Sequence, residues 1–269
     1  MRTLVTALLL VFAASVAAQP AVEAPLGRVL GAVVRADGLV DYGLLRRAHA
    51  DDLDAALGAI ASTDPASLRS NEEKTAFLLN AYNAHVLRRV LDTPQARNLE
   101  SQNLFGAFFE TPVRVAGQQL TLNQIEHGLL RRQNTVDGAA VPSSARALRP
   151  ARLDARIHAG LNCAAVSCPP LVREPFTATR VSGQLDRAWR AFLASPRAAR
   201  VEGRSVVLSS ILDWFASDIE AGGARVGDVV LAEQPSPALS EALRGKSAAT
   251  LKETRGVTFA YDWTVNRAR

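Results

Sequence analysis

The stretch around Cys163 has the residue types that nucleophilic catalysis by a thiol requires. Cys163 lies among small residues, and His158 precedes it by five positions. Because the thiolate is the reactive form of cysteine, such a site needs a base or a positive charge that lowers the pKa of the thiol. A helix would place His158 and Cys163 on well-separated sides, and a strand would place them on opposite faces. His158 can therefore reach Cys163 only if the backbone turns between them, for example at Gly160.

The pair Glu126-His127 offers a second imidazole, on a predicted helix beside apolar positions. An unperturbed histidine titrates near pH ~6.5, so His127 is a candidate general base. Because His127 belongs to a different element, it can approach Cys163 without a turn of the backbone between the two residues. Glu126 is a candidate for orienting the imidazole. A buried, hydrogen-bonded histidine explains the same pair equally well, and the sequence leaves both interpretations open.

Asn80 and Asn83 interrupt an apolar helical pattern three positions apart, so they share a face of the helix. A buried amide destabilises a protein unless it forms hydrogen bonds. We favour a role in tying a neighbouring loop to the helix. The alternative is a catalytic role, in which either amide orients an imidazole or polarises an oxyanion. His85 lies toward Arg88 and Arg89 and is predicted to be a surface group.

The same residues allow two non-nucleophilic interpretations. Cys163 and Cys168 are the only two cysteines, and an oxidising compartment would permit a disulfide between them. Closing so short a loop contributes only about 2 kcal/mol, too little to hold a fold together. Two histidines, two cysteines and Glu126 also offer zinc ligands. Because neither a Cys-x-x-Cys nor a His-Glu-x-x-His pattern is present, metal binding ranks below the other interpretations and no cofactor is predicted.

Two capping boxes mark the helices that carry these residues. Ser70 and Glu73 predict the start of the helix of the two asparagines, which ends before Pro94. Thr121 and Gln124 predict the start of the helix of the Glu-His pair. The candidate residues are therefore expected on defined elements with fixed starts.

The rest of the chain alternates helical and extended patterns. Residues 44–60 and 182–193 predict amphipathic helices, and residues 136–150, rich in Ala, Ser and Pro, predict a loop. Residues 201–208 predict two strands joined by a turn, and residues 257–263 a closing strand. Helices interspersed with short antiparallel strands predict a mostly helical α+β fold.

Residues 1–18 predict a cleavable secretory signal peptide. Arg2 gives a basic start, the apolar run that follows is too short to span a bilayer, and small residues precede Gln19. No later apolar stretch is long enough to cross a membrane. We therefore expect residues 19–269 to form a single globular domain that is periplasmic or secreted, without a transmembrane segment.

The composition fits a folded domain and argues against nucleic-acid binding. The chain is 48% hydrophobic and 21% charged, so it can form a sizeable core rather than a disordered chain. The formal net charge of +5 comes largely from scattered arginines, and aromatic residues make up only 6%. Neither a basic groove nor a base-stacking platform is indicated.

Four motifs resemble, in order, those of the domain of unknown function 547 family, and they occupy residues 76–83, 122–127, 156–170 and 261–263. The resemblance extends from about Asp41 to Asn266 and implies a common fold, but it supplies no activity. Leu78 stands where the family usually has Trp, so any indole contact there is lost. Some members keep the first cysteine and have Ser at the second, which implies Cys163 as the nucleophile candidate rather than half of an obligatory disulfide.

These observations lead to competing functions outside the cytoplasm. The first is a thiol-dependent hydrolase or acyltransferase, in which Cys163 attacks a carbonyl and His127 or His158 is the base. The second is a non-catalytic envelope protein that binds a partner. It predicts a Cys163–Cys168 disulfide and two buried, fully hydrogen-bonded histidines. The third is a metal site at the same residues. The sequence names neither the substrate nor the partner.

Overall fold

The computed structural model describes residues 21–100 and 104–268, so the predicted signal peptide and its cleavage position lie outside the described residues. The α+β prediction is confirmed. The helical elements follow one another as α1 (Glu23–Val33), α2 (Tyr42–Ala48), α3 (Ala50–Ser62), η1 (Pro65–Ser67), α4 (Asn71–Asp92), α5 (Leu104–Phe109), η2 (Gln124–Leu130), η3 (Ser143–Leu148), α6 (Ile157–Gly160), α7 (Val181–Leu193), α8 (Ile211–Trp214), α9 (Ala216–Glu220), α10 (Val226–Glu233), α11 (Pro237–Leu243) and α12 (Ala248–Glu253). The strands are β1 (Val113–Val115), β2 (Gln118–Leu120), β3 (Thr135–Val136), β4 (Ala139–Ala140), β5 (Ala199–Glu202), β6 (Ser205–Ser209) and β7 (Val257–Ala260).

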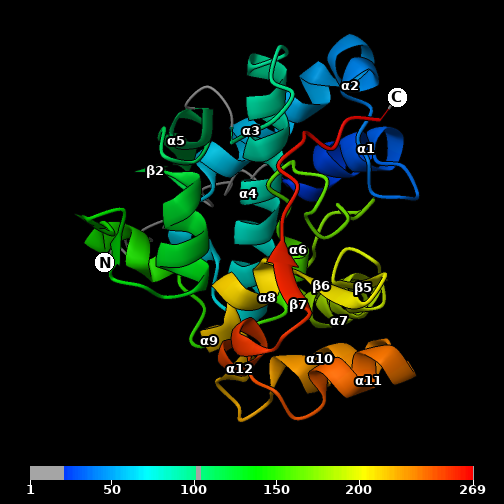
Figure 1. Cartoon of the computed structure of the whole chain (residues 1–269). Helices are drawn as coiled ribbons and strands as arrows, with labels where there is room; N and C mark the ends of the chain where they lie inside the picture. Colours follow the sequence, from blue (N-terminus) through cyan, green and yellow to red (C-terminus); the bar gives the residue numbers. More distant parts are fainter. Residues whose placement is uncertain (1–20, 101–103, 269) are drawn as a thin grey trace, which may run out of the picture.

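Helix α4 runs through the middle of the molecule (Figure 1). The Ser70 hydroxyl accepts a hydrogen bond from the Glu73 N–H, and the Glu73 carboxylate accepts one from the Ser70 N–H, so the predicted capping box is confirmed. The helix ends at Asp92, just before Pro94, as predicted. Residues 76–87 are all buried. A helix buried all round must satisfy every polar side chain it carries.

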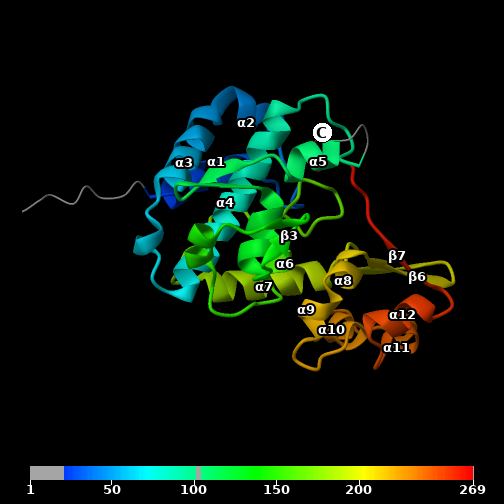
Figure 2. The ribbon, with the colours of Figure 1, turned by 90° about the vertical axis from the view of Figure 1, so that its left-hand side faces the viewer.

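The core consists of two hydrophobic clusters, and α7 begins in one and ends in the other. The larger one surrounds α4 and includes side chains of α1, α3 and η2. The smaller one covers the sheet of β5, β6 and β7 with helices α8 to α12. Val181 and Leu185 of α7 belong to the larger cluster, whereas Phe192 and Leu193 belong to the smaller one. Figure 2 shows the two groups of elements side by side, with α7 running along the lower edge of the larger group toward the smaller one.

The sheet of the smaller cluster has the strand order β5-β6-β7. Strands β5 and β6 pair antiparallel through the predicted turn, where Gly203 has a φ of 61°. Strand β7 pairs with β6 in parallel, in contrast to the antiparallel pairing predicted for the strands. A parallel pair needs a long crossover connection, and helices α8 to α12 supply it.

Several local predictions need correction. The helix predicted over residues 44–60 is divided into α2 and α3 at His49. The predicted loop 136–150 contains part of the β3–β4 hairpin and the 3₁₀ helix η3. The second capping box forms between Thr121 and Gln124, but the segment that it opens, η2, is a π-helix. These differences change the element boundaries and leave the fold class unchanged.

The last described residues return from the smaller cluster to the larger one, as the red segment in Figure 1 shows. Thr264, Val265 and Arg267 form isolated β-bridges with Asn98, Ala165 and Val40, respectively. This return places the preceding residues 261–263 against the segment between α6 and α7. Among the described residues, no helix has the length and apolar character needed to span a membrane.

Candidate functional site

A pocket with a volume of about 310 Å³ lies between the two clusters. It is lined by α4, α5, η2, α6 and α8 and by the segments 161–169 and 261–263. Four of the predicted site residues reach it from two segments that are distant in sequence: Glu126, His127, His158 and Cys163. The pocket therefore gathers an imidazole pair, a carboxylate and a sulfur in one lining.

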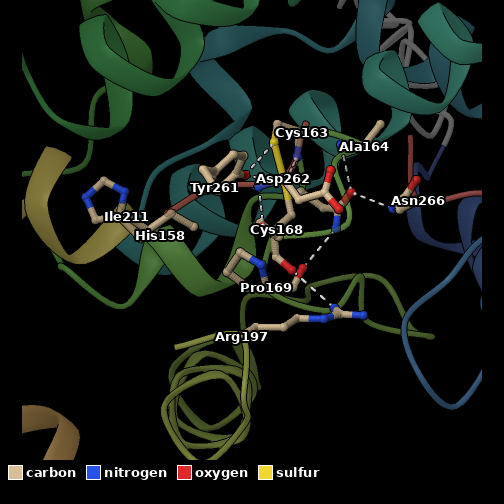
Figure 3. The surroundings of a disulfide bond; sticks show 12 residues. His158, Cys163, Ala164, Cys168, Pro169, Arg197, Ile211, Tyr261, Asp262 and Asn266 are labelled. Atoms are coloured by element: carbon tan, nitrogen blue, oxygen red, sulfur yellow. Dashed lines mark hydrogen bonds between the residues drawn. A yellow bond between two sulfur atoms is a disulfide. The ribbon is translucent and has the colours of Figure 1, made fainter. Parts of the chain in front are cut away.

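A disulfide joins Cys163 and Cys168 at the sulfur end of the pocket (Figure 3). Cys163 is partly exposed, whereas Cys168 is buried. The Tyr261 hydroxyl lies 3.0 Å from Sγ of Cys163 and 3.1 Å from Sγ of Cys168. Disulfide sulfurs carry no proton, so the hydroxyl is the donor in both contacts. Within residues 21–100 and 104–268, no histidine lies within hydrogen-bonding distance of either sulfur.

The loop between the two cysteines is held by Asn162. Its side-chain oxygen accepts hydrogen bonds from the Ala164 N–H at 2.9 Å and from Nδ2 of Asn266 at 3.1 Å, and its Nδ2 donates to the Pro169 carbonyl at 2.8 Å. Ala164 adopts a φ of 65°, a conformation that residues other than Gly rarely adopt. The surroundings must therefore stabilise this turn, which presents Cys163 to the pocket.

Asn80 and Asn83 are buried but do not line the pocket. Nδ2 of Asn83 donates to the Gly160 carbonyl at 2.9 Å, and its Oδ1 accepts from the Asn162 N–H at 3.0 Å. Asn80 makes the same pair of bonds to the backbone of Phe176, at 2.8 and 2.9 Å. Both amides tie a neighbouring loop to α4, which is the role favoured from the sequence. Asn83 acts on the cysteine segment only through the backbone that precedes Cys163.

His158 is the buried imidazole of the site. Its Nε2 lies 2.9 Å from Oδ2 of Asp218, and its ring stacks on Phe215 with a centroid distance of 3.7 Å. Burial lowers the pKa of His158 below its usual value, which outweighs the opposing effect of the Asp218 carboxylate. A carboxylate only accepts hydrogen bonds, so Nε2 carries the proton and Nδ1 keeps a free lone pair. Among the described residues, Nδ1 has no hydrogen-bond partner, whereas a purely structural role predicts a fully bonded ring.

Arg131 connects the two histidines through Asp218. Its Nε and Nη2 donate to Asp218 at 2.5 and 3.2 Å, and its Nη1 lies 3.1 Å from Nδ1 of His127. A guanidinium only donates, so His127 accepts at Nδ1 and carries its proton on Nε2. Burial opposes ionisation of Asp218, but the hydrogen bonds from His158 and Arg131 outweigh it and lower the pKa of this carboxyl. In this state, His127 offers the pocket a donor and His158 offers a base.

Sequence reasoning missed Asp218 and the role of Tyr261, and it gave Arg131 no role. Arg131 follows His127 by four residues, so the helical spacing could have indicated the contact. The residues around Asp218 carry no comparable signal, and Tyr261 stood out only within the Tyr-Asp-Trp motif. Among the residues that the structure describes, no group of three or more His, Cys, Asp or Glu side chains has an arrangement that could hold a metal ion.

A family model described as "Protein of unknown function, DUF547" matches residues 65–193. This segment belongs to the DUF547 family. No curated protein and no solved structure matches the chain. The DUF547 segment supplies α4, η2, α6 and the cysteine loop, whereas Asp218 and Tyr261 lie beyond it. Two residues beyond the segment that the family model matches, Asp218 and Tyr261, therefore complete the site.

Proposed function

We propose that this protein is a thiol-dependent hydrolase or acyltransferase that acts outside the cytoplasm and uses Cys163, in its reduced form, as the nucleophile. The observation that supports it most is the partial exposure of Cys163 in the same pocket as Glu126, His127 and His158. An apolar-lined pocket with a few convergent polar groups is where binding and catalysis are expected.

His158 is the better candidate for the base. Its Nδ1 has a free lone pair, and the Asp218 carboxylate on the other nitrogen stabilises the imidazolium that forms when Nδ1 takes a proton. His127, which is a donor at Nε2, is suited to stabilising a developing oxyanion. The Tyr261 hydroxyl, which contacts both sulfurs, is suited to stabilising the Cys163 thiolate.

The proposed reaction has two steps. The Cys163 thiolate attacks the carbonyl carbon of an ester, amide or thioester, a C–S bond forms, and the bond to the leaving group breaks. Because His158 does not contact the sulfur, one bridging water carries the thiol proton to it, and the leaving group departs with that proton. Water or an acceptor molecule then attacks the enzyme thioester, the C–S bond breaks, and Cys163 regains a proton.

The disulfide makes the nucleophile dependent on reduction. Releasing Cys163 and Cys168 as thiols requires two electrons and two protons, which a dithiol donor supplies as it is oxidised to its own disulfide. The oxidised form is then a resting state of the enzyme.

Thiol–disulfide exchange is a second candidate function. One specific observation favours it: the disulfide has an accessible sulfur, Cys163, and a buried sulfur, Cys168. In exchange, an external thiolate attacks the accessible sulfur, and the buried thiolate leaves and later resolves the mixed disulfide.

Three variants separate these functions: Cys163→Ser, Cys168→Ser and His158→Gln, with His49→Gln, outside the pocket, as the matched control. We would measure labelling by iodoacetamide and hydrolysis of 4-nitrophenyl esters with and without dithiothreitol. We expect the wild type to react only after reduction, and Cys168→Ser to hydrolyse esters without it. Cys163→Ser should be inactive, and His158→Gln should be slower by about a hundredfold, the usual contribution of a general base. His49→Gln should match the wild type.

Two results would contradict the hydrolase or acyltransferase proposal. One is a reduced wild type that is neither labelled at Cys163 nor active on esters. The other is a reduced wild type that reduces a disulfide substrate, with that activity lost in Cys168→Ser and no ester hydrolysis in any variant. The second result would favour exchange.

A further inference from the structure

Two hydrogen-bond acceptors face each other at the end of the pocket formed by η2 and α6. Oε1 of Glu126 lies 4.0 Å from Nδ1 of His158, too far for a hydrogen bond between them. The His158 side chain is fully buried, and within the described part of the chain its Nδ1 has no hydrogen-bond partner, because the ring proton is directed to Asp218. Two acceptors at this separation are complementary to one group that carries at least two N–H or O–H donors.

The charges around these acceptors favour a cation. Arg131 is paired with Asp218, so their charges offset each other. His158 is neutral, because burial lowers its pKa. Within the described ranges, Glu126 has no Lys or Arg partner within 4.0 Å, although its side chain is only 13% exposed. Its carboxylate accepts a hydrogen bond from the Tyr82 hydroxyl, which is neutral and leaves the negative charge in place. A mostly buried carboxylate without a counter-ion binds a cationic donor more strongly than a neutral one.

Aromatic rings form the neighbouring wall of the pocket. Tyr261 packs against Trp263 and Trp214 with ring centroids at 4.5 and 4.8 Å, and Trp263 contacts Phe105 at 5.0 Å. Phe105 and Trp214 are 40% and 45% exposed, so the wall continues to the outer surface. Aromatic faces attract ammonium groups and bury the apolar body attached to them.

We infer that the pocket binds a primary ammonium group between Glu126 and Nδ1 of His158, with the apolar body of the same molecule against the aromatic wall of Phe105, Trp214, Tyr261 and Trp263. The inference rests on the proposed function in one respect: it names a primary amine as the acceptor of the acyl group. The chain is then an acyltransferase to amines rather than a hydrolase.

The acceptor step balances as follows. The ammonium gives up a proton to Nδ1 of His158 or to Glu126, and the free amine attacks the carbonyl carbon of the Cys163 thioester. A C–N bond forms and the C–S bond breaks. Of the two protons that the ammonium loses in all, one returns to the Cys163 sulfur and the other passes to solvent.

The subsite can be tested by binding alone, in the Cys163→Ser protein, which cannot form a thioester. The probes are 2-phenylethylammonium and its neutral analogue 2-phenylethanol, measured by isothermal titration calorimetry at pH 7. We expect the ammonium to bind at least about tenfold more tightly, as for a charge-assisted hydrogen bond compared with a neutral one. When Glu126→Gln is added to Cys163→Ser, the preference for the ammonium over the alcohol should disappear. When Glu253→Gln, on the surface of α12, is added instead, the preference should remain.

Three results would overturn the subsite: equal affinity for the two probes, no binding of either, or an unchanged preference in Glu126→Gln. The comparison of the two probes needs no variant of Glu126, so it decides the question even if Glu126→Gln does not fold. Ammonium selectivity in a protein whose thiol is unreactive would leave the subsite intact and contradict only the proposed function. A reactive thiol in a protein without ammonium selectivity would contradict the subsite and leave the proposed function intact.

Discussion

Asp218 gives the two histidines opposite hydrogen-bonding roles. It accepts the Nε2 proton of His158 and binds the guanidinium of Arg131, which in turn donates to His127. One buried carboxylate therefore leaves His158 as an acceptor toward the pocket and His127 as a donor. The two rings therefore present different hydrogen-bonding groups to the pocket, an acceptor from His158 and a donor from His127, as acid–base catalysis requires.

His85 shows the effect of burial on a histidine outside the pocket. The sequence predicted a surface group, but this side chain of α4 is buried and donates from Nε2 to the Arg114 carbonyl of β1 at 3.2 Å. The prediction was wrong because the neighbouring arginines indicated an exposed face, whereas the β1–β2 hairpin covers it. Burial lowers the pKa of His85 to about 4.

This shift predicts a pH dependence of stability. The unfolded chain takes up a proton on His85 near pH 6.5 and the folded chain only near pH 4, so stability falls as the pH drops below about 6.5. Between pH 6.5 and 5, we expect His85 to remove about 2 kcal/mol from the free energy of unfolding. His85→Gln keeps a hydrogen-bond donor, and urea unfolding should show a shallower pH dependence than the wild type. Parallel profiles would contradict this prediction.

Local signals predicted the elements better than the site at which they meet. The capping boxes at Ser70 and Thr121 and the hairpin of β5 and β6 depend on neighbours in sequence, and all three are confirmed. The parallel pairing of β7 depends on a crossover through five helices, which no local pattern encodes. Asp218 contacts His158 across 60 positions. Such contacts follow from packing, so sequence spacing could nominate the cysteine segment but could not find its full set of partners.

Helix α4 positions the cysteine segment through Asn83. Its amide bonds both the Gly160 carbonyl and the Asn162 N–H. Gly160 also lies so close to α4 and α7 that an added Cβ would be 2.8 Å from Leu185 and 3.2 Å from Leu79. The backbone before Cys163 is thus fixed by both hydrogen bonding and packing.

Asn83→Ala should therefore loosen this segment. It leaves a buried carbonyl and a buried N–H without partners, so we expect the free energy of unfolding to fall by about 2–4 kcal/mol. Asn71→Ala, at the exposed start of α4, removes one bond to the Ala151 N–H and should cost about 1 kcal/mol. Urea unfolding measures both variants, and hydrogen exchange at residues 160–164 should rise only in Asn83→Ala. Equal destabilisation by the two variants would argue against a special role for Asn83.

At the scale of the whole molecule, the chain crosses between the two clusters more than once. Helix α7 carries it into the smaller cluster, and the segment after β7 brings it back. The pocket lies between these crossings and takes side chains from both clusters. Its shape therefore depends on how the clusters are held together.

Deletion of residues 264–269 tests this dependence. It removes the backbone bonds of Asn266 to Ala164 and Val40 and the side-chain bond from Tyr42, while Tyr261 and Trp263 remain in the chain. We expect a loss of roughly 3–5 kcal/mol, since several buried hydrogen bonds disappear together. Hydrogen exchange should accelerate around Val40 and Ala164, whereas the helices α10 to α12, which pack within the smaller cluster, should stay protected. Uniform loss of protection would show that the two clusters unfold as one unit. If the deletion prevents folding altogether, Asn266→Ala removes the side-chain bonds alone, and the same local pattern of exchange is expected.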